Sequence, residues 1–333
     1  MKWAPHHLAE FWANAETHQR IFKTKLCMAE SPTDACDARI VQAHTIPRSQ
    51  LRQIAVDGHV YSMSASPSDL VQNDGLITAK KIGINKFSVL NCFCAKHDND
   101  LFSPIEDEPL IFSAHQLALL QYRTVASEVY RKVMGHRTTL THLREQKEKS
   151  HSAEALERMT LLLSYARGEE LALRDSGAAF ALCEKNLFGE IYDGVSALVV
   201  HFKKMPSIMT VGGFLPECDY HGNTLQLLGN DKAIYEAVSF NILSVEGQAA
   251  LAFLWTKGES VVKSFAESFI DQEPSRYTTM AIQTAFEHLE NTCMAPQWWE
   301  SLRKVKRDLL LRRMQIGGSP FEKRQSNASL TAA

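Results

Sequence analysis

The sequence reads LCMAESPTDACDARIVQAHTIP over residues 26–47 and NCFCAKHD over residues 91–98. These two stretches hold four of the seven cysteines of the chain, a histidine directly before an Ile-Pro turn, and a Cys-x-x-His pair. In a reducing compartment cysteines stay free, so a cluster of them indicates metal ligands before it indicates disulfides. We therefore expect the N-terminal part of the chain to be organised around a metal site.

The ligand types and their spacing indicate a structural Zn²⁺ site. Zinc favours four tetrahedral ligands drawn from thiolates and imidazoles. Cys94 and His97 have the spacing that a tight turn needs to hold both side chains on one metal, and Cys27 and Cys36 supply the second pair. Cys92 lies two positions before Cys94, and on a strand it faces the same side. Cys92 therefore stays open as an alternative to one of the other ligands.

Length, composition and charge limit the class of protein. The 333 residues suffice for one large domain or for two to three ordinary ones, and 45% hydrophobic residues are typical of a globular protein with a real core. The net charge of −2 favours no class of partner by itself. The N-terminus lacks the apolar core of a signal peptide, and no apolar run reaches the length of a membrane helix. We expect a cytoplasmic protein without a membrane partner.

Periodicity along the chain predicts an α+β protein in four parts. Residues 1–110 form the zinc-binding module with an N-terminal helix, and the strands and helix around its two metal-binding pairs have the outline of a treble-clef or ββα-metal unit. Residues 111–192 predict a long helical hairpin, which offers a surface for a second copy of the chain. Residues 193–315 predict an antiparallel sheet with a helical cap, and residues 316–333 a disordered tail.

The sheet is predicted from five strand candidates separated by turn residues. Polar residues 64–75 are expected to form a loop, and a basic helix is expected at the end of the third part, over residues 298–314. Outside the module, few residues are of a type that binds ligands. His201, Cys218 and His221, expected near strand ends, are the basis of a weak alternative, a small-molecule site in the sheet. The strand candidates are residues 197–202, 207–214, 224–228, 237–245 and 249–255.

The run Ala43-His44-Thr45-Ile46-Pro47 resembles the first signature of HNH nucleases, and the resemblance covers residues 26–106. In that family the histidine activates the water that attacks a phosphodiester, an asparagine orients it, and a later helical residue binds a divalent ion. The resemblance implies that His44 is the base and that Asp98 is a ligand of Mg²⁺ or Mn²⁺. Asn91, or alternatively Asn85, is then the orienting amide.

Two features bear on whether such a module would be active. Ala43 stands where the family usually has a metal-binding acid, so one ligand of the catalytic ion is missing. If His97 instead corresponds to the catalytic histidine of the family, Cys92 must complete the zinc site. Four lysines lie close to the motif in sequence and are candidates for contacts with nucleic-acid phosphates: Lys80, Lys81, Lys86 and Lys96.

The sequence therefore leaves two functions of different classes. The first is a metal-dependent DNA endonuclease of the HNH type, which analogy alone links to bacterial defence against phage or mobile elements. The second is a catalytically inactive, zinc-stabilised adaptor that binds a nucleic acid or a partner protein. Arg303 and Arg307, four residues apart, add a further candidate surface for phosphate contacts.

Overall fold

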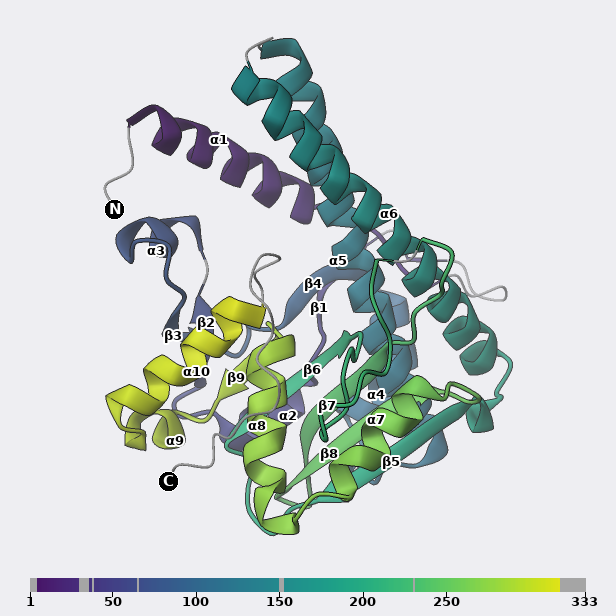
Figure 1. Cartoon of the computed structure of the whole chain (residues 1–333). Helices are drawn as coiled ribbons and strands as arrows, with labels where there is room; N and C mark the ends of the chain where they lie inside the picture. The colour runs from purple at the N-terminus through teal and green to yellow at the C-terminus, as the bar shows by residue number, and fades with distance from the viewer. Residues whose placement is uncertain are drawn as a thin grey trace.

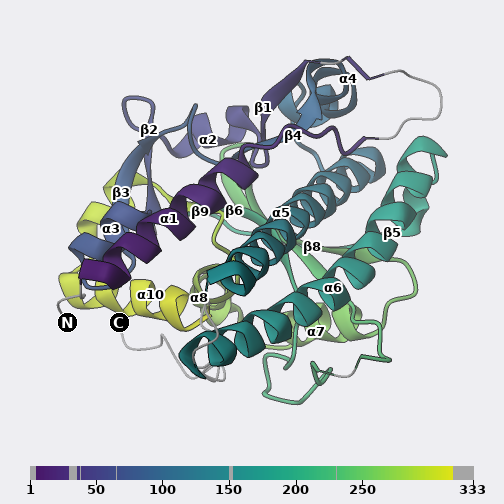
Figure 2. The same cartoon turned by 90° about the horizontal axis from the view of Figure 1, so that it is seen from above.

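A seven-stranded antiparallel sheet forms the centre of the molecule (Figures 1 and 2). The computed structural model describes residues 5–29, 36–37, 39–64, 66–149, 153–229 and 231–317. Within them the chain is α+β, as predicted, with a long helical hairpin and antiparallel sheets. In spatial order the strands of the large sheet are β3 (Thr78–Gly83), β2 (His59–Ser64), β9 (Thr292–Met294), β6 (Ile208–Phe214), β7 (Val238–Val245), β8 (Gln248–Thr256) and β5 (Val195–His201).

The central strands are buried on both faces, so their side chains belong alternately to two hydrophobic cores. On one face Leu243 and Leu254 pack with the helical hairpin and the N-terminal module. On the other face Phe240 and Phe253 pack with the C-terminal helices. The Phe253 ring lies 5.9 Å from that of Phe265 in an edge-on arrangement. Because successive side chains of a strand point to opposite faces, a nearly continuous apolar run lets one sheet bury both faces.

The helical hairpin consists of α5 (Ala114–Lys149) and α6 (Ala153–Phe188), which pack along each other. Each helix has 36 residues, which at 1.5 Å per residue gives a length of roughly 54 Å. One part of α5 lies across the sheet, and the far end of the hairpin extends beyond it, where α1 (Pro5–Phe22) contacts α5 (Figure 1). Glycine is required at Gly212 of β6, where an added Cβ would meet Leu289 Cδ2 at 2.6 Å.

The opposite face of the sheet is covered by the C-terminal helices (Figure 1). A buried ion pair between Arg313 and Glu287, with an N–O distance of 3.0 Å, joins the last helix of the chain to the helix that carries Glu287. The helices of this layer are α7 (Val261–Ile270), α8 (Tyr277–His288), α9 (Pro296–Ser301) and α10 (Lys304–Gly317).

A second, two-stranded sheet carries the N-terminal motif. Strand β1 (Ile40–His44) pairs with β4 (Val89–Cys94) in antiparallel register, and α4 (Ala95–Glu106) follows β4 directly. Between β1 and β4 the chain forms α2 (Arg48–Ile54), β2, α3 (Pro67–Gln72) and β3. Because β2 pairs with β9, the segment inserted between β1 and β4 belongs to the large sheet. That sheet therefore draws strands from both sides of the boundary expected at residue 110.

Three local expectations differ from the structure. Part of the expected loop at 64–75 is the short helix α3, which begins at Pro67 after an N-cap in which Ser66 accepts a hydrogen bond from the backbone N–H of Asp69. Residues 224–228 form no strand, because Thr224 makes only an isolated bridge to Cys218. Residues 292–294 form a strand, β9, that the sequence pattern did not indicate.

The ends of the chain are described only in part. The tail expected to be disordered, residues 316–333, lies outside the described residues apart from the last two residues of α10. None of the helices in the described part of the chain has the length and apolar character that a membrane crossing demands.

Candidate metal centre

Four side chains from two distant segments meet at the start of α4. The ligand atoms of Cys27, Cys36, Cys94 and His97 all lie within 4.8 Å of one another. Nδ1 of His97 is 3.3 Å from the sulfur of Cys27 and 3.6 Å from that of Cys36. These four residues are the predicted zinc ligands, and the structure brings all of them together.

The distances fit a tetrahedral ion. With Zn–S near 2.3 Å and Zn–N near 2.05 Å, the sulfur and nitrogen corners of a tetrahedron are about 3.6 Å apart. The two sulfur–nitrogen distances to His97 agree with this value. Three thiols and one imidazole also match the soft donor set that zinc selects over magnesium or calcium. The quartet can therefore hold a metal ion of the zinc type.

The local fold explains why the two segments meet. Residues 26–28 run beside β4, with the N–H of Leu26 donating to the Asn91 carbonyl and that of Met28 to the Cys92 carbonyl. The backbone N–H of Cys94 donates to the sulfur of Cys27 over 3.3 Å. Cys94 is in turn the N-cap of α4, and its sulfur accepts from the N–H of His97. Cys94 and His97 therefore occupy the N-cap and first turn of one helix, where a three-residue spacing puts both on one side.

Burial and the neighbouring backbone groups act on the Cys27 thiol in opposite directions. Burial raises the pKa of the Cys27 thiol to about 12. Hydrogen bonds with the backbone of Cys94 and Ala29 act in the opposite direction and lower this pKa. A metal ion would replace the proton, because thiolate is the form that coordinates it. Nε2 of His97 is buried and has no hydrogen-bond partner among the described residues.

Cys92 lies outside the quartet. Its side chain is fully buried and belongs to the hydrophobic core, and burial raises its pKa to about 12. The structure thus places His97, and not Cys92, with the other three ligands. The sequence could not decide between the two because it does not show where β4 ends and the helix begins.

His44 stands at the end of β1, opposite Val89 at the start of β4. Its Nε2 lies 2.9 Å from the carbonyl oxygen of Ile84. A carbonyl oxygen only accepts, so Nε2 carries a proton, and in the neutral form of the ring Nδ1 is then the lone-pair acceptor. This is the tautomer in which an imidazole can take a proton from water.

The turn after His44 is held by a network of hydroxyl groups. Thr45 Oγ1 lies 2.5 Å from Ser88 Oγ, and the N–H of Ile46 donates to the same Ser88 oxygen. Asn291, which precedes β9, donates from Nδ2 to Thr45 Oγ1 over 2.9 Å. The position of His44 therefore depends on residues from three separate segments. The sequence pattern gave no signal for Ser88 or Asn291.

Asp98 follows His97 in the first turn of α4. Burial raises the pKa of its carboxyl group and the charge of Glu106 adds to this effect, whereas the charges of Arg123 and His44 act in the opposite direction. Its Oδ1 is buried without a hydrogen-bond partner among the described residues. An unpaired carboxylate oxygen in this position fits one ligand of a hard divalent ion. However, no cluster of three metal-ligating side chains in the described part of the chain includes Asp98.

A buried ion pair lies behind this site. Arg123 of α5 is 1% exposed and donates from Nη1 to Glu106 Oε1 over 2.6 Å. Its guanidinium group also lies 4.0 Å from the centre of the Phe102 ring. The second oxygen of Glu106 accepts from the N–H of Arg48 at the start of α2. One carboxylate at the end of α4 therefore joins α2, α4 and α5.

The other predicted site residues lie apart from His44 or are already paired. Asn91 donates to the Lys23 carbonyl over 3.4 Å, so its expected role in orienting His44 gains no support from these contacts. Lys80 pairs with Asp69, and Lys81 with Glu300 over 2.8 Å. Lys86 is exposed, and Lys96 lies 3.9 Å from Asp100 on the surface of α4. As a group these lysines do not form one patch beside the metal centre.

The remaining candidates belong to the large sheet and its helices. Cys218 and His221 lie at a turn, and His221 contacts the amide of Gln272 rather than the thiol. His201 is exposed at the end of β5. Arg313 of the basic helix is 7% exposed and paired with Glu287, so only part of that helix is a charged surface.

Comparison of the chain with protein-family models, with curated proteins and with solved structures finds no match. Any function therefore has to be argued from the geometry just described.

Proposed function

We propose that the chain is a metal-dependent endonuclease that hydrolyses phosphodiester bonds in DNA. The observation that carries this proposal is the arrangement of His44 and Asp98 on a strand pair and helix that a four-ligand metal site holds together. His44 is the general base, because its Nε2 is engaged by the Ile84 carbonyl and its Nδ1 is left as an acceptor. Asp98 is the ligand of the catalytic ion.

The structural ion and the catalytic ion have different roles in this proposal. Zinc, held by Cys27, Cys36, Cys94 and His97, fixes the start of α4 and thereby the position of Asp98. A magnesium or manganese ion at Asp98 supplies Lewis-acid stabilisation of the phosphate oxygens. The buried pair of Arg123 and Glu106 joins α4, the helix that carries Asp98, to α5.

A specific observation favours a second function, that of a zinc-stabilised adaptor without catalysis. Ala43, at the place of the missing metal-binding acid, is 1% exposed and part of the hydrophobic core. Three of the four lysines expected to contact nucleic acid already lie within ion-pair distance of acidic side chains. In this alternative the metal centre only stabilises the fold, and the binding surface lies elsewhere.

Cleavage of plasmid DNA by the purified protein with Mg²⁺ or Mn²⁺ distinguishes the two functions. We expect His44→Ala to lower the cleavage rate by about 10²-fold or more, the typical contribution of a general base, with zinc content unchanged. His201→Ala, which removes an exposed histidine at the end of β5, is the matched control and should cleave normally. If wild type and His44→Ala are equally inactive while both retain zinc, the adaptor is the better description.

A further inference from the structure

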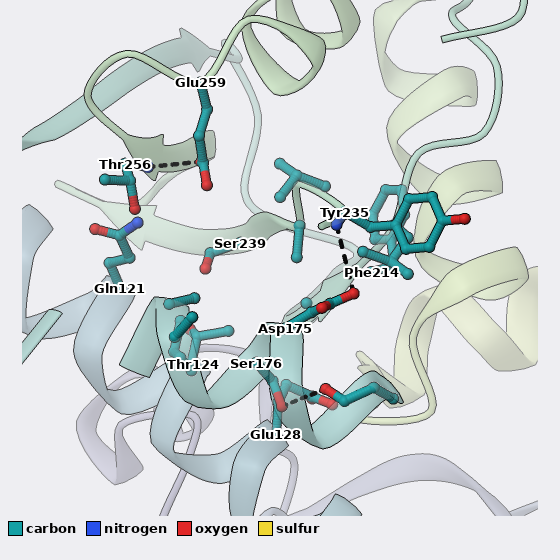
Figure 3. A pocket seen from close by; sticks show the side chains of 18 of the residues that line it. Gln121, Thr124, Glu128, Asp175, Ser176, Phe214, Tyr235, Ser239, Thr256 and Glu259 are labelled. Atoms are coloured by element: carbon teal, nitrogen blue, oxygen red, sulfur yellow. Dashed lines mark hydrogen bonds between the residues drawn. The ribbon is translucent and has the colours of Figure 1, made fainter. Parts of the chain in front are cut away.

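A cavity of about 240 Å³ lies between the helical hairpin and the large sheet (Figure 3). Its walls come from α5, α6, the ends of β6 and β8, and the start of β7. Apolar side chains such as Val125, Leu182 and Phe214 supply most of the wall. At roughly 30 Å³ per water molecule, this volume corresponds to about eight waters or to one small organic molecule. The metal centre contributes none of the lining residues.

Two polar side chains in the cavity lack partners within the protein. Ser239 of β7 and Gln121 of α5 line the cavity and are only 3% and 4% exposed. Neither side chain has a hydrogen-bond partner among the residues that the structure describes. Figure 3 shows Ser239, Gln121 and Thr256 among the side chains that line the cavity. Both side chains can therefore hydrogen-bond to a polar group bound in the cavity.

The charges around the cavity restrict the class of ligand. Among the residues that the structure describes, three carboxylates line it, and Lys132 is the only lysine or arginine in the wall. Lys132 lies 3.6 Å from Glu128, so its charge is already compensated. Asp175 is compensated as well, through Arg174 at 2.6 Å. A phosphate or carboxylate would therefore enter a field of its own sign, which disfavours nucleotides and organic acids.

Glu259 is the carboxylate in the wall that lacks a cation. It accepts a hydrogen bond from the N–H of Thr256 over 2.9 Å, and within the described residues no cationic side chain is within ion-pair distance of it. Burial raises the pKa of Glu259 to about 7, and the nearby charge of Glu236 adds to this effect. Glu236 itself is engaged by the N–H groups at the start of α7. An ammonium group would supply the counter-charge that Glu259 lacks.

We propose that this cavity binds a small organic amine. Its ammonium group lies against the carboxylate of Glu259, and its apolar body lies against Val125 and Phe214. Ser239 receives or donates the remaining hydrogen bond of the ligand. This binding site is independent of the proposed nuclease activity, because it shares no residue with the metal centre.

Tyramine and tryptamine are suitable probes, with 4-hydroxyphenylacetate and indole-3-acetate as counterparts of similar size and opposite charge. Binding to the full chain is measured by isothermal titration calorimetry and by the shift in unfolding temperature. Glu259→Gln removes the negative charge but keeps the acceptor for Thr256. Ala179→Phe, on the α6 wall, fills the cavity. Glu267→Gln on α7, which removes a charge from an exposed ion pair with Lys263, is the control.

We expect at least one amine to bind the wild type and the Glu267→Gln control equally, and the two carboxylates not to bind. The amine affinity should fall about tenfold or more in Glu259→Gln, and binding should be lost in Ala179→Phe. The proposal is overturned if neither amine binds at about 10 mM, if the carboxylates bind as well as the amines, or if Glu259→Gln leaves the amine affinity unchanged. Unchanged affinity in a folded Ala179→Phe variant would also overturn it. The Glu259→Gln result stands even if Ala179→Phe fails to fold.

Discussion

Ser88 adopts a left-handed backbone conformation, with a φ of 59°, directly before β4 begins. Non-glycine residues adopt this conformation rarely, and it costs free energy. At Ser88 the cost is offset by contacts to the turn that follows His44: its hydroxyl accepts from Ile46, and its carbonyl accepts from the N–H of Thr45. A single serine therefore connects the two strands at the level of His44.

Ser88→Ala tests this role. The variant keeps the strained backbone and leaves the N–H of Ile46 without its acceptor, so we expect the free energy of unfolding to fall by about 1–3 kcal/mol. If His44 is the general base, the cleavage rate should fall as well, because the ring is no longer held in position. Chemical denaturation measures the first effect, and Ser264→Ala on the exposed side of α7 is the control. A variant as stable as wild type would contradict this assignment.

Glu259 predicts a pH dependence of stability at the residue scale. Its pKa is raised by burial from 4.5 to about 7, with the charge of Glu236 as a second cause, and the thiol of Cys183 also lies close enough to interact with it. The folded protein therefore binds a proton that the unfolded chain has released. This contribution is fully present below pH 4.5 and is lost as the pH rises towards 7.

Glu259→Gln should remove this dependence. A shift from 4.5 to about 7 corresponds to about 3 kcal/mol at most, and the water that the cavity admits reduces this figure. We expect the free energy of unfolding of the wild type to fall relative to the variant between pH 5 and pH 7. Urea unfolding of both proteins across this range measures the difference. Parallel pH profiles would show that the pKa of Glu259 is not raised.

At the scale of elements, α5 connects the two halves of the molecule. Tyr122 and Arg123 face the N-terminal module, where Tyr122 packs near Phe93 and Phe102. Gln121 and Thr124, their neighbours on the same helix, face the cavity above the sheet. Residues one position apart on a helix point about 100° apart, so one helix can serve both sites.

The ion pair of Arg123 with Glu106 predicts a strongly non-additive double mutant. Arg123→Met removes the cation and leaves the Glu106 carboxylate partly buried and uncompensated, so we expect a loss of about 3–5 kcal/mol. Adding Glu106→Gln removes that charge while keeping an acceptor for the Arg48 N–H, and should recover part of the loss. Thermal or chemical unfolding of the two single variants and the double variant measures the coupling. Simple additivity of the two losses would argue against a pair of this kind.

At the scale of the whole molecule, the module and the sheet are joined by specific contacts as well as by packing. Gln50 of α2 donates from Nε2 to the Ser244 carbonyl over 3.1 Å and accepts from the Ser244 N–H over 2.7 Å. Asn291 donates both to Thr45 and to the Val211 carbonyl. Strand β2 pairs with β9. These links place the strand pair with His44 beside the sheet.

Removal of the metal tests whether a loss of structure in the module also affects the large sheet. We expect a chelator to expose the thiols of Cys27, Cys36 and Cys94 and to speed amide hydrogen exchange in residues 26–28 and 89–106. Protection in β6, β7 and β8 should persist, because none of the fully buried members of the two cores that cover those strands is a candidate metal ligand. Hydrogen exchange followed by mass spectrometry, with and without the chelator, measures this pattern. Equal protection in both conditions would mean that no metal stabilises the module.

The sequence by itself determined the features that depend on local spacing. Cys94 and His97 share the start of one helix because three residues make most of a helical turn, and the alternation of apolar residues identified β5, β6, β7 and β8. The helical hairpin follows from two long segments of helical period. In each case neighbouring residues carry the physical cause, so the pattern is visible along the chain.

Only the tertiary structure decided the rest. The pairing of β2 with β9 joins residues more than 200 positions apart, and the three-residue strand β9 is too short to show an alternation of its own. The same holds for the hydroxyl network at Thr45, for the buried pair of Arg123 and Glu106, and for the cavity between the hairpin and the sheet. These arrangements depend on which surfaces are complementary once the elements pack. The spacing of residues within one segment does not show which distant segment that segment will contact.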